Sequence, residues 1–458
     1  MFSRKLWAIA AGLGFLFFGG LGFYLYSSDS FSPSRSQSSS AKDSSRILEN
    51  SIITSKTDKV EDEPSALFND PAISQAWGLK KSDAGRAWSV TKGSRDIVVA
   101  VIDTGIEVKH EDLSGNLWKN PGETGKDAQG RDKASNGIDD DGNGFVDDVY
   151  GWNFVSNNNK LDDNHGHGTH IAGIIGAEAG NGKGITGIAP EVSLMILKYY
   201  DPKVAGTDNL KNTVAAIRYA VKMGANIINY SGGGTEYSKE EYEAISEAQK
   251  KDILFVAAAG NERSNSDQHH YYPADYKLSN IISVTAIDPS TQVLASSNYG
   301  VETVDIAAPG QNILSCLPGG SYGYMTGTSQ ATAFVSGAAA LVMAHKQSFK
   351  AEDVKKYILA TGDAQTQLAS KTRTSRQLNL YKALTVLDQG VSSSGGVALN
   401  PQNLKFTVDP NETNSKSSSD NGMDPNARQM GEFGRSLIDA MGTHKRLPTK
   451  LGTKQDLD

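Results

Sequence analysis

The chain has 458 residues and a formal net charge of −7, and it is long enough to bury a sizeable core in one large domain or two ordinary ones. A mildly acidic chain without a basic stripe argues against nucleic acid as the main partner. The single cysteine, Cys316, excludes an intramolecular disulfide and leaves the redox compartment undetermined.

An uncharged apolar run, residues 6–26, follows Arg4 and Lys5. At helical rise the run is long enough to cross a bilayer. We interpret residues 1–5 as a cytoplasmic N-terminus and residues 6–26 as a transmembrane anchor. The alternative is a cleaved secretory signal, although such signals usually have a shorter apolar core that ends at small residues. Either interpretation predicts a protein that is membrane-anchored or secreted, with the rest of the chain on the periplasmic or extracellular face.

The composition divides the remaining chain into three parts. Residues 27–65 are rich in Ser and poor in apolar side chains, which indicates a flexible tether. Residues 66–388 have the apolar density of a globular domain. Residues 389–458 form a low-complexity tail that we expect to be mostly disordered. Within this tail, residues 430–441 place apolar side chains on one face of a potential helix, either transient or a docking element.

Within the globular part, apolar runs rich in β-branched residues alternate with segments of helical periodicity. The runs cover residues 97–102, 192–197, 225–229, 253–258 and 281–284, and the helical segments cover residues 170–179, 210–223, 240–251, 331–345, 352–360 and 378–387. Continuous apolar runs are typical of strands buried on both faces. The alternation therefore predicts an α/β fold with a doubly wound, mainly parallel sheet and helices on both faces.

A Gly327-Thr328-Ser329 turn precedes the Ala-rich helical segment 331–345. A serine in the first turn of a buried helix lies beside free backbone N–H groups and the positive end of the helix dipole. Both favour the negative charge that develops in acyl transfer. Serine at a helix start is also a common cap, so this stretch alone leaves both interpretations open.

Three distant stretches carry side chains that complement Ser329. Asp103 ends the strand 97–102, His167 opens a helix of small residues, and Asn261 lies in a glycine turn after the strand 253–258. A serine nucleophile needs a base within hydrogen-bond reach, and that base needs a carboxylate to orient it. Asp103, His167 and Ser329 supply these roles in chain order. Asn261 could donate its side-chain N–H to the oxyanion beside the backbone N–H of Ser329.

These motifs resemble those of the subtilisin-like serine protease family, the subtilases, in which the triad has the chain order Asp, His, Ser. The similar stretches are Asp103-Thr104-Gly105-Ile106, the segment 167–173 and Gly327-Thr328-Ser329. The resemblance extends from about residue 77 to residue 387. It implies a subtilisin-like fold and a serine endopeptidase that hydrolyses polypeptides.

The resemblance also implies a role for each matched residue. Ser329 is then the nucleophile of an acyl-enzyme, His167 the general acid and base, Asp103 its orienting carboxylate, and Asn261 a donor in the oxyanion hole. Ser231, Gly232 and Gly233 offer an edge to which an extended peptide substrate pairs. We expect a monomer.

Two alternatives of other classes use the same residues. One is a catalytically silent, envelope-anchored peptide-binding protein, and the other is a peptide ligase or another serine hydrolase. The chain also departs from the family at Gln330, where the family often has Met, and at Ala333-Phe334, where Pro and His are usual. Glu262 is either an acidic group of the specificity pocket or a solvated residue at its rim.

The acidic loop 136–148 predicts a structural calcium site, because oxygen ligands recur at alternate positions around a turn glycine. The candidate ligands in this loop are Asp139, Asp141, Asn143, Asp147 and Asp148. The pattern departs from an EF-hand because Tyr150 takes the place of the bidentate Glu. A solvated acidic turn is the alternative, but such a dense cluster repels itself without a cation.

Two further metal hypotheses are weaker. Asp112 and Asn181 partly match the other common calcium site of the family. His165, His167 and His170 could also be interpreted as a zinc cluster, although the serine and aspartate stretches favour catalysis by His167.

Overall fold

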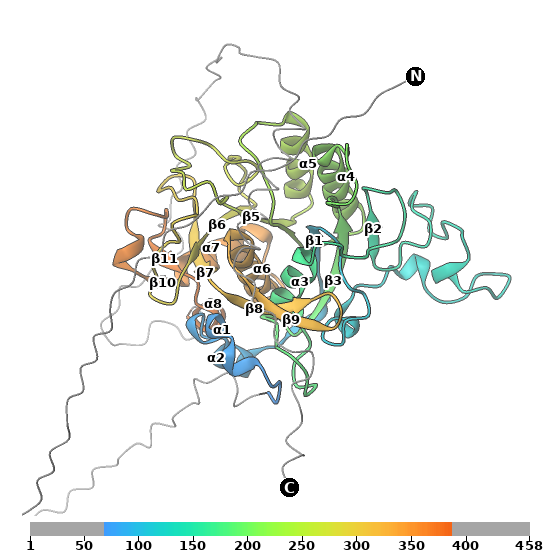
Figure 1. Cartoon of the computed structure of the whole chain (residues 1–458), viewed down its shortest axis with the longest axis horizontal. Helices are drawn as coiled ribbons and strands as arrows, with labels where there is room; N and C mark the ends of the chain where they lie inside the picture. The colour runs from blue at the N-terminus through green and yellow to red at the C-terminus, as the bar shows by residue number, and fades with distance from the viewer. Residues whose placement is uncertain (1–67, 387–458) are drawn as a thin grey trace, which may run out of the picture. The chain divides into compact units, whose positions relative to one another are not determined.

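The computed structural model describes residues 68–386 (Figure 1). These residues fall within the globular domain proposed at 66–388. The predicted N-terminus 1–5, the tether 27–65 and the tail 389–458 lie outside the described residues. Those three predictions stay predictions.

The predicted fold class included a transmembrane helix, and this part of the prediction is wrong. Among the helices of residues 68–386, none combines the length and the apolar composition needed to span a bilayer. The predicted span, residues 6–26, lies outside the described part. The most apolar long helix that is described, α6 (Thr328–His345), interrupts its apolar residues with Ser, Thr and Gly and is buried in the core instead.

A nine-stranded sheet forms the centre of the described domain. In spatial order its strands are β10 (Asp363–Ala364), β11 (Arg376–Gln377), β7 (Ile306–Pro309), β6 (Ile281–Ile287), β5 (Leu254–Ala258), β4 (Ile227–Tyr230), β1 (Gly93–Asp103), β3 (Glu191–Lys198) and β2 (Gly151–Asn153). All neighbouring pairs are parallel except β10 with β11. The carboxyl ends of the central strands therefore meet at one edge, where ligand sites form in such sheets.

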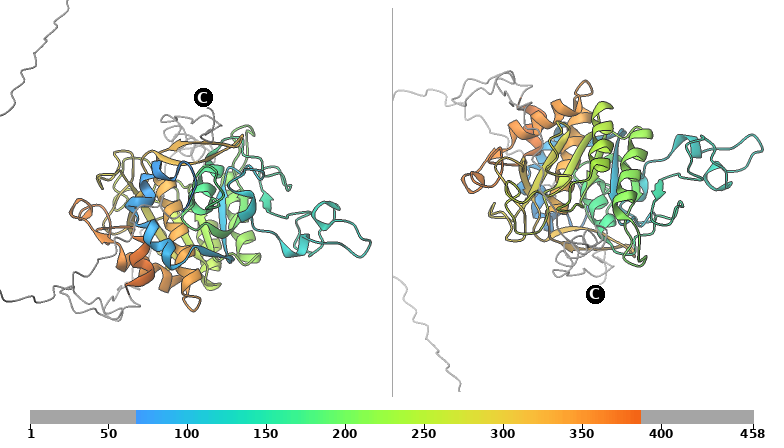
Figure 2. Two further views of the ribbon diagram at one scale, coloured as in Figure 1. Left: turned by 90° about the horizontal axis from the view of Figure 1, so that it is seen from below. Right: turned by 90° about the horizontal axis from the view of Figure 1, so that it is seen from above.

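Helices cover both faces of this sheet, and Figure 2 shows the two layers from opposite sides. In β1, Val99 and Val101 pack with α3 (His167–Gly176) and α6, whereas Ala100 and Ile102 pack with α4 (Asn209–Lys222) and α5 (Lys239–Lys250). Side chains of a strand alternate between faces. A central strand therefore needs apolar residues at every position, which explains the continuous runs of the sequence.

The remaining elements pack around these layers. They are α1 (Trp77–Lys81), α2 (Ala84–Val90), α7 (Ala351–Thr361), α8 (Leu380–Thr385) and the antiparallel hairpin of β8 (Ile313–Leu317) and β9 (Ser321–Met325). The hairpin contacts α3, and α8 contacts α2, α6 and α7. The segment between β1 and β2, which carries the acidic loop, extends beyond the β2 edge of the sheet (Figure 1).

Most predicted helices agree with the structure to within two residues, but two begin three residues earlier than their apolar patterns indicate. Helix α3 begins at His167 and α6 begins at Thr328. Both therefore carry a candidate catalytic residue in the first turn. Every residue of α6 from Thr328 to Met343 is buried, and a Cβ at Gly337 would lie 2.5 Å from that of Ile188. This close approach fixes α6 against the segment before β3.

A buried carboxyl group in α5, that of Glu241, lowers the stability of the folded protein when it is ionised. Glu241 is 3% exposed and accepts a 2.9 Å hydrogen bond from the hydroxyl of Tyr276. Burial raises the pKa of Glu241 to about 7, and the bond from Tyr276 opposes this only in part. The pKa is higher in the folded state than in the unfolded state. The folded protein therefore loses stability as the pH rises from about 4.5 to about 7.

We predict that Glu241→Gln stabilises the protein at pH 8 by up to about 3 kcal/mol, since each pKa unit corresponds to about 1.4 kcal/mol. Gln keeps an acceptor for Tyr276 but carries no charge. The two proteins should differ little at about pH 4, below both pKa values. Urea unfolding at both pH values checks this, with Glu240→Gln as the control because Glu240 is exposed. A difference between wild type and Glu241→Gln that does not change with pH would contradict the prediction.

Candidate active site

A buried carboxylate and imidazole meet at the carboxyl end of β1. Asp103 ends the strand, His167 opens α3, and Nδ1 of His167 lies 2.7 Å from Oδ1 of Asp103. The two residues are 3% and 1% exposed. The backbone N–H of Thr104 also donates to Oδ1 at 2.8 Å. The ring of His167 is therefore fixed through Nδ1, and Nε2 is the ring nitrogen left for chemistry.

Asp163 holds the start of α3 in place. Its Oδ1 accepts hydrogen bonds from the N–H groups of His165 and Gly166 and from the hydroxyl of Thr104. Its Oδ2 accepts from the N–H and the hydroxyl of Thr169. These donors include N–H groups at the helix start that need a partner. Gly166, at φ +98°, makes the turn into the helix. The sequence suggested only that Asp163, with Asp162, belongs to the ion-dependent region of the acidic loop, and it did not predict this role, which depends on contacts that only the fold creates.

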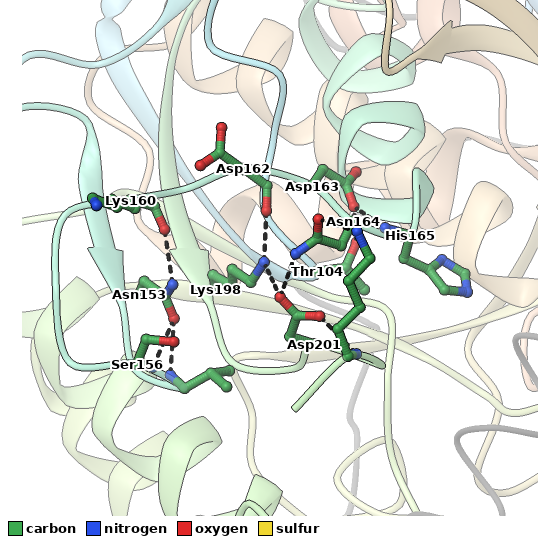
Figure 3. Close-up of polar contacts among 12 residues, drawn as sticks. Thr104, Asn153, Ser156, Lys160, Asp162, Asp163, Asn164, His165, Lys198 and Asp201 are labelled. Carbon is green, nitrogen blue, oxygen red and sulfur yellow. Dashed lines mark hydrogen bonds and ion pairs between the residues drawn. The ribbon is translucent and has the colours of Figure 1, made fainter. Parts of the chain in front are cut away.

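The loop before α3 is also held by a buried ion pair (Figure 3). Lys198, at the end of β3, is 1% exposed, lies 2.7 Å from the carboxylate of Asp201 and donates to the carbonyl of Asp162 at 2.6 Å. Asn164 donates to Asp201 at 2.7 Å. Burial alone would raise the pKa of Asp201, but Lys198 and its other donors lower it overall. The pair therefore ties the loop 161–166 to β3.

The pKa of His167 is raised above its ordinary value. Burial acts to lower it, but Asp103, which is hydrogen-bonded to the ring, and the charge of Asp163 together outweigh burial. Both carboxylates favour an imidazolium. This is the electrostatic arrangement expected of a base that takes up a proton during a reaction.

Ser329 lies in the first turn of α6 and is 5% exposed. Its hydroxyl donates to the carbonyl of Ser231 at 3.1 Å, and the hydroxyl of Ser231 donates to the carbonyl of Ser329 at 3.3 Å. Asn229 donates to Ser231 and accepts from Ser336, which lies two turns along α6. This chain of bonds joins the end of β4 to α6 and fixes the position of Ser329.

Asn261 lies beside the start of α6, in the turn after β5. Its Oδ1 accepts from the N–H and the hydroxyl of Thr328 at 3.1 and 3.2 Å. The amide is thereby oriented with Oδ1 toward Thr328, so that Nδ2 faces the other way. Glu262 accepts a 2.7 Å bond from Asn298, whose Oδ1 also accepts from the backbone of this turn. Glu262 thus takes part in holding the turn.

Gln330, next to Ser329, is fully buried. Among the residues that the structure describes, neither Oε1 nor Nε2 of its amide has a hydrogen-bond partner. Burying an amide without partners costs about 1 to 3 kcal/mol. A Cβ at Gly327 would lie 3.2 Å from Oε1 of Gln330, so the amide packs against the Gly327 backbone. The departure from the family at this position is therefore a polar group inside the core.

The structure brings two of the predicted calcium ligands together with a residue that sequence reasoning missed. Oxygen atoms of Glu123, Asp139 and Asp141 lie within 4.8 Å of one another. Glu123 is fully buried, its Oε1 accepts from the N–H of Asp140, and Oε2 has no partner among the described residues. Burial and the charges of Asp148 and Asp141 raise the pKa of Glu123. The donor set suits Ca²⁺, which prefers carboxylate oxygens.

The other ligands predicted in this loop have separate hydrogen-bond partners. Asn143 donates to Asp141 and Asp148 at 3.2 and 2.9 Å. Asp148 is buried and also accepts from Tyr219. Asp147 accepts from the N–H of Gly137 instead. The sequence could not reveal Glu123, because it precedes the loop and reaches it only through the turn η4 (Pro121–Glu123).

The weaker metal hypotheses have different outcomes. Asn181 donates to Asp112 at 2.8 Å, so the structure brings this pair together. The histidines do not form a cluster with metal-binding geometry in residues 68–386. His170 Nε2 lies 3.0 Å from the carbonyl of Ile313, in the hairpin, so its ring is a partner of β8.

The family of the chain is shown by comparison with known proteins. Residues 94–380 match the model of the family described as the Subtilase family. The chain belongs to the subtilase family. This match covers more than half of the sequence and includes Asp103, His167, Asn261 and Ser329.

Several relatives agree with this assignment. The subtilase is 33% identical over 330 residues to the thermophilic serine proteinase of Bacillus sp. (strain AK1), with 70% of this chain and 72% of that protein covered. It is 33% identical over 317 residues to thermitase of Thermoactinomyces vulgaris, with 69% and 98% covered. It is 36% identical over 272 residues to the major intracellular serine protease of Bacillus subtilis (strain 168), with 59% and 75% covered. The family model and these relatives support the assignment of the chain as a serine protease.

A solved structure supports the fold. A protease of Pseudoalteromonas arctica aligns with 70% of this chain, and 99% of that protease is covered, at a TM-score of 0.56 and 23% identity. At that identity the likeness concerns the fold alone. The roles of individual residues in this subtilase rest on its own geometry.

We predict that Asp163→Asn lowers the pKa of His167, because the charge of Asp163 helps to raise it. The variant should also lose about 1 to 2 kcal/mol of stability, since a neutral amide accepts more weakly from the start of α3. NMR titration of the His167 ring and thermal melting check both effects. Asp162→Asn is the matched control, because the Asp162 side chain is exposed. An unchanged or raised His167 pKa in Asp163→Asn would refute the electrostatic role.

Proposed function

We propose that this subtilase is a serine endopeptidase that hydrolyses peptide bonds through an acyl-enzyme on Ser329. The observation that carries the proposal is the buried 2.7 Å contact between Asp103 and His167 at the carboxyl edge of the sheet. A solvent-excluded carboxylate and imidazole in this geometry are the partners that a serine nucleophile requires. Ser329 starts a buried helix at the same edge of the sheet.

In this mechanism the hydroxyl of Ser329 leaves the carbonyl of Ser231 and attacks the substrate carbonyl carbon. Its proton passes to Nε2 of His167, and Asp103 stabilises the resulting imidazolium. His167 then gives the proton to the leaving amine, and the acyl-enzyme remains on Ser329. A water molecule, deprotonated by His167, releases the acid product. Catalytic hydrogen bonds often form only when substrate is bound, which fits the bond from Ser329 to Ser231 in the free enzyme.

The negative charge on the substrate oxygen needs donors. The N–H of Ser329 lies at the positive end of α6, an 18-residue helix. The side chain of Asn261 is oriented by Thr328 so that Nδ2 can supply a second donor. Removing one such donor typically costs roughly a hundredfold or more in rate. The edge of Ser231, Gly232 and Gly233 would hold the substrate as an added strand.

We expect a fluorophosphonate probe to label the full-length protein on Ser329 and casein to be cleaved at a rate at least about a thousandfold above that of Ser329→Ala. Ser89→Ala serves as the control, because Ser89 is exposed in α2 and its hydroxyl donates to the carbonyl of Arg86 in the same helix. Labelling and casein cleavage are measured on the same folded samples.

The outcomes separate the alternatives. Absence of Ser329-dependent labelling in folded protein would reject the acyl-enzyme and favour a catalytically silent peptide-binding protein. Labelling without hydrolysis, but with joining of two added peptides, would favour a peptide ligase.

We infer that calcium stabilises this subtilase through the cluster of Glu123, Asp139 and Asp141, with Asn143 beside it. The support is the buried carboxylate of Glu123, which has one oxygen without a partner among the described residues and which brings an oxygen within 4.8 Å of oxygens of Asp139 and Asp141. A bound cation would relieve the repulsion among these groups. A second ion at Asp112 and Asn181 stays a prediction, as do the calcium roles of Asp147 and Asp148.

Calcium should raise the melting temperature and a chelator should lower it, because an ion that binds only the folded state, at roughly a hundred times its Kd, adds about 3 kcal/mol of stability. Glu123→Gln should reduce this calcium response. Asp132→Asn is the control, since Asp132 is exposed and pairs with Lys126. A wild-type melt that ignores the chelator, or a normal response in Glu123→Gln, would contradict the site.

We also infer that the protease acts outside the cytoplasm. The support is the sequence alone, in which Arg4 and Lys5 precede an apolar run typical of export signals. These residues lie outside the described structure. A monomeric state likewise stays a prediction.

A further inference from the structure

The ring of Tyr271 lies between the two segments that flank Ser329. A Cβ at Gly233 would lie 2.5 Å from Cε1 and 3.0 Å from Cζ of Tyr271. A Cβ at Gly260 would lie 3.0 Å from Cδ1 of the same ring. The ring therefore packs against the backbone of both glycines. Tyr271 is 3% exposed, so its ring is almost wholly covered by neighbouring groups.

The backbone around Tyr271 is tied down on both sides. Its N–H donates to the carboxylate of Asp275 at 2.8 Å. The next residue, Tyr272, exchanges two backbone hydrogen bonds with Gly234, at 2.7 and 2.8 Å. The ring thus belongs to a segment that is paired to the proposed peptide-binding edge. The ring of Tyr271 can move away from Gly233 and Gly260 only if this backbone pairing breaks or the side chain adopts another rotamer.

The space that the ring occupies is where a substrate side chain would point. Strands β4 and β5 are neighbours, and their carboxyl ends lead to Ser231 and to Asn261. Ser329 bonds to Ser231, and Thr328 bonds to Asn261. A carbonyl attacked by Ser329 would therefore lie between these segments. The side chain next to that carbonyl would project into the gap between Gly233 and Gly260.

We propose that Tyr271 closes the pocket for the residue that contributes the attacked carbonyl, so that this subtilase selects Gly or Ala at that position. The inference rests on the proposed acyl-enzyme at Ser329. The groups beside Gly260 are equally close, because a Cβ there would lie 2.4 Å from Oε2 of Glu262 and 2.5 Å from Nδ2 of Asn298, which are hydrogen-bonded to each other. A larger substrate side chain would have to displace the packed ring of Tyr271 or this hydrogen-bonded pair.

The test uses full-length protein and peptides that differ only in the residue before the scissile bond, with Gly, Ala, Leu, Phe or Lys at that position. Cleavage sites are identified by mass spectrometry, and kcat/KM is measured for each peptide. For wild type we expect Gly and Ala peptides to exceed Leu, Phe and Lys peptides by at least about a hundredfold, within the range of pocket discrimination. Tyr271→Ala should raise kcat/KM for Leu and Phe relative to Ala by at least about tenfold.

Three further variants separate an effect on the pocket from loss of the fold. Tyr271→Phe keeps the ring and should retain the wild-type preference, whereas Tyr271→Leu opens part of the space and should shift it toward Leu. Tyr381→Ala removes a tyrosine of α8 whose ring centre lies 3.8 Å from the guanidinium carbon of Arg86. This control should retain the wild-type preference. Melting curves and fluorophosphonate labelling confirm that each variant is folded.

The possible failures are distinguishable. Wild type that is labelled at Ser329 but cleaves Leu, Phe or Lys peptides as well as Ala peptides would overturn the closed pocket and leave the endopeptidase standing. A Lys preference would overturn it too, and would assign the pocket to Glu262 instead. A folded Tyr271→Ala or Tyr271→Leu with an unchanged preference would also overturn the inference. Loss of Ser329 labelling in wild type would reject the proposed function itself.

Discussion

The burial of helix α6 is the constraint on which the rest of this subtilase depends. The helix contacts five neighbouring strands, β1, β4, β5, β6 and β7, and it is buried from Thr328 to Met343. Helix and sheet bury their apolar surfaces against each other, which is the main favourable contribution to such a fold. This packing also sets the position of the proposed nucleophile. Ser329 reaches the ends of β4 and β5 because the helix behind it cannot shift along the sheet without opening the core.

The groups proposed for catalysis come from different elements, and local hydrogen bonds align them. Asp103 belongs to strand β1 and His167 to helix α3. Asp163 and Lys198 hold the loop before α3 in place against the end of the sheet. Buried charges normally oppose folding unless they are paired. Here Asp103 and Lys198, which are buried, and Asp163, which is half-buried, each have several donors or a partner, so the same contacts compensate for burial and restrict motion. Positioning and stability are therefore linked in this part of the molecule.

The central strands could be predicted from the sequence, whereas the residues proposed for catalysis stay predictions and much of their surroundings could not be foreseen. Continuous apolar runs such as 97–102 indicate doubly covered strands, and the order of Asp103, His167 and Ser329 is specific. Glu123, Asp163 and Tyr271 carry no local pattern, because each acts through contacts with residues distant in sequence. The hairpin of β8 and β9 and the short edge strands were missed for a similar reason, since tertiary contacts decide them. The fold class predicted with a transmembrane helix is wrong, since none of the helices in residues 68–386 could span a bilayer. The residues assigned to that helix, 6–26, lie outside the described part.

The amide of Gln330 has a chemical consequence for the durability of the site. A methionine at this position would be open to oxidation of its thioether to a polar sulfoxide, and such a change beside Ser329 would disturb the packing there. Gln contains no sulfur for peroxide to attack. The methionine nearest to Ser329 in the sequence, Met325, is 1% exposed, and Cys316 is fully buried. Gln330 thus carries the energetic cost of a buried amide without hydrogen-bond partners, but it places no oxidisable sulfur next to Ser329.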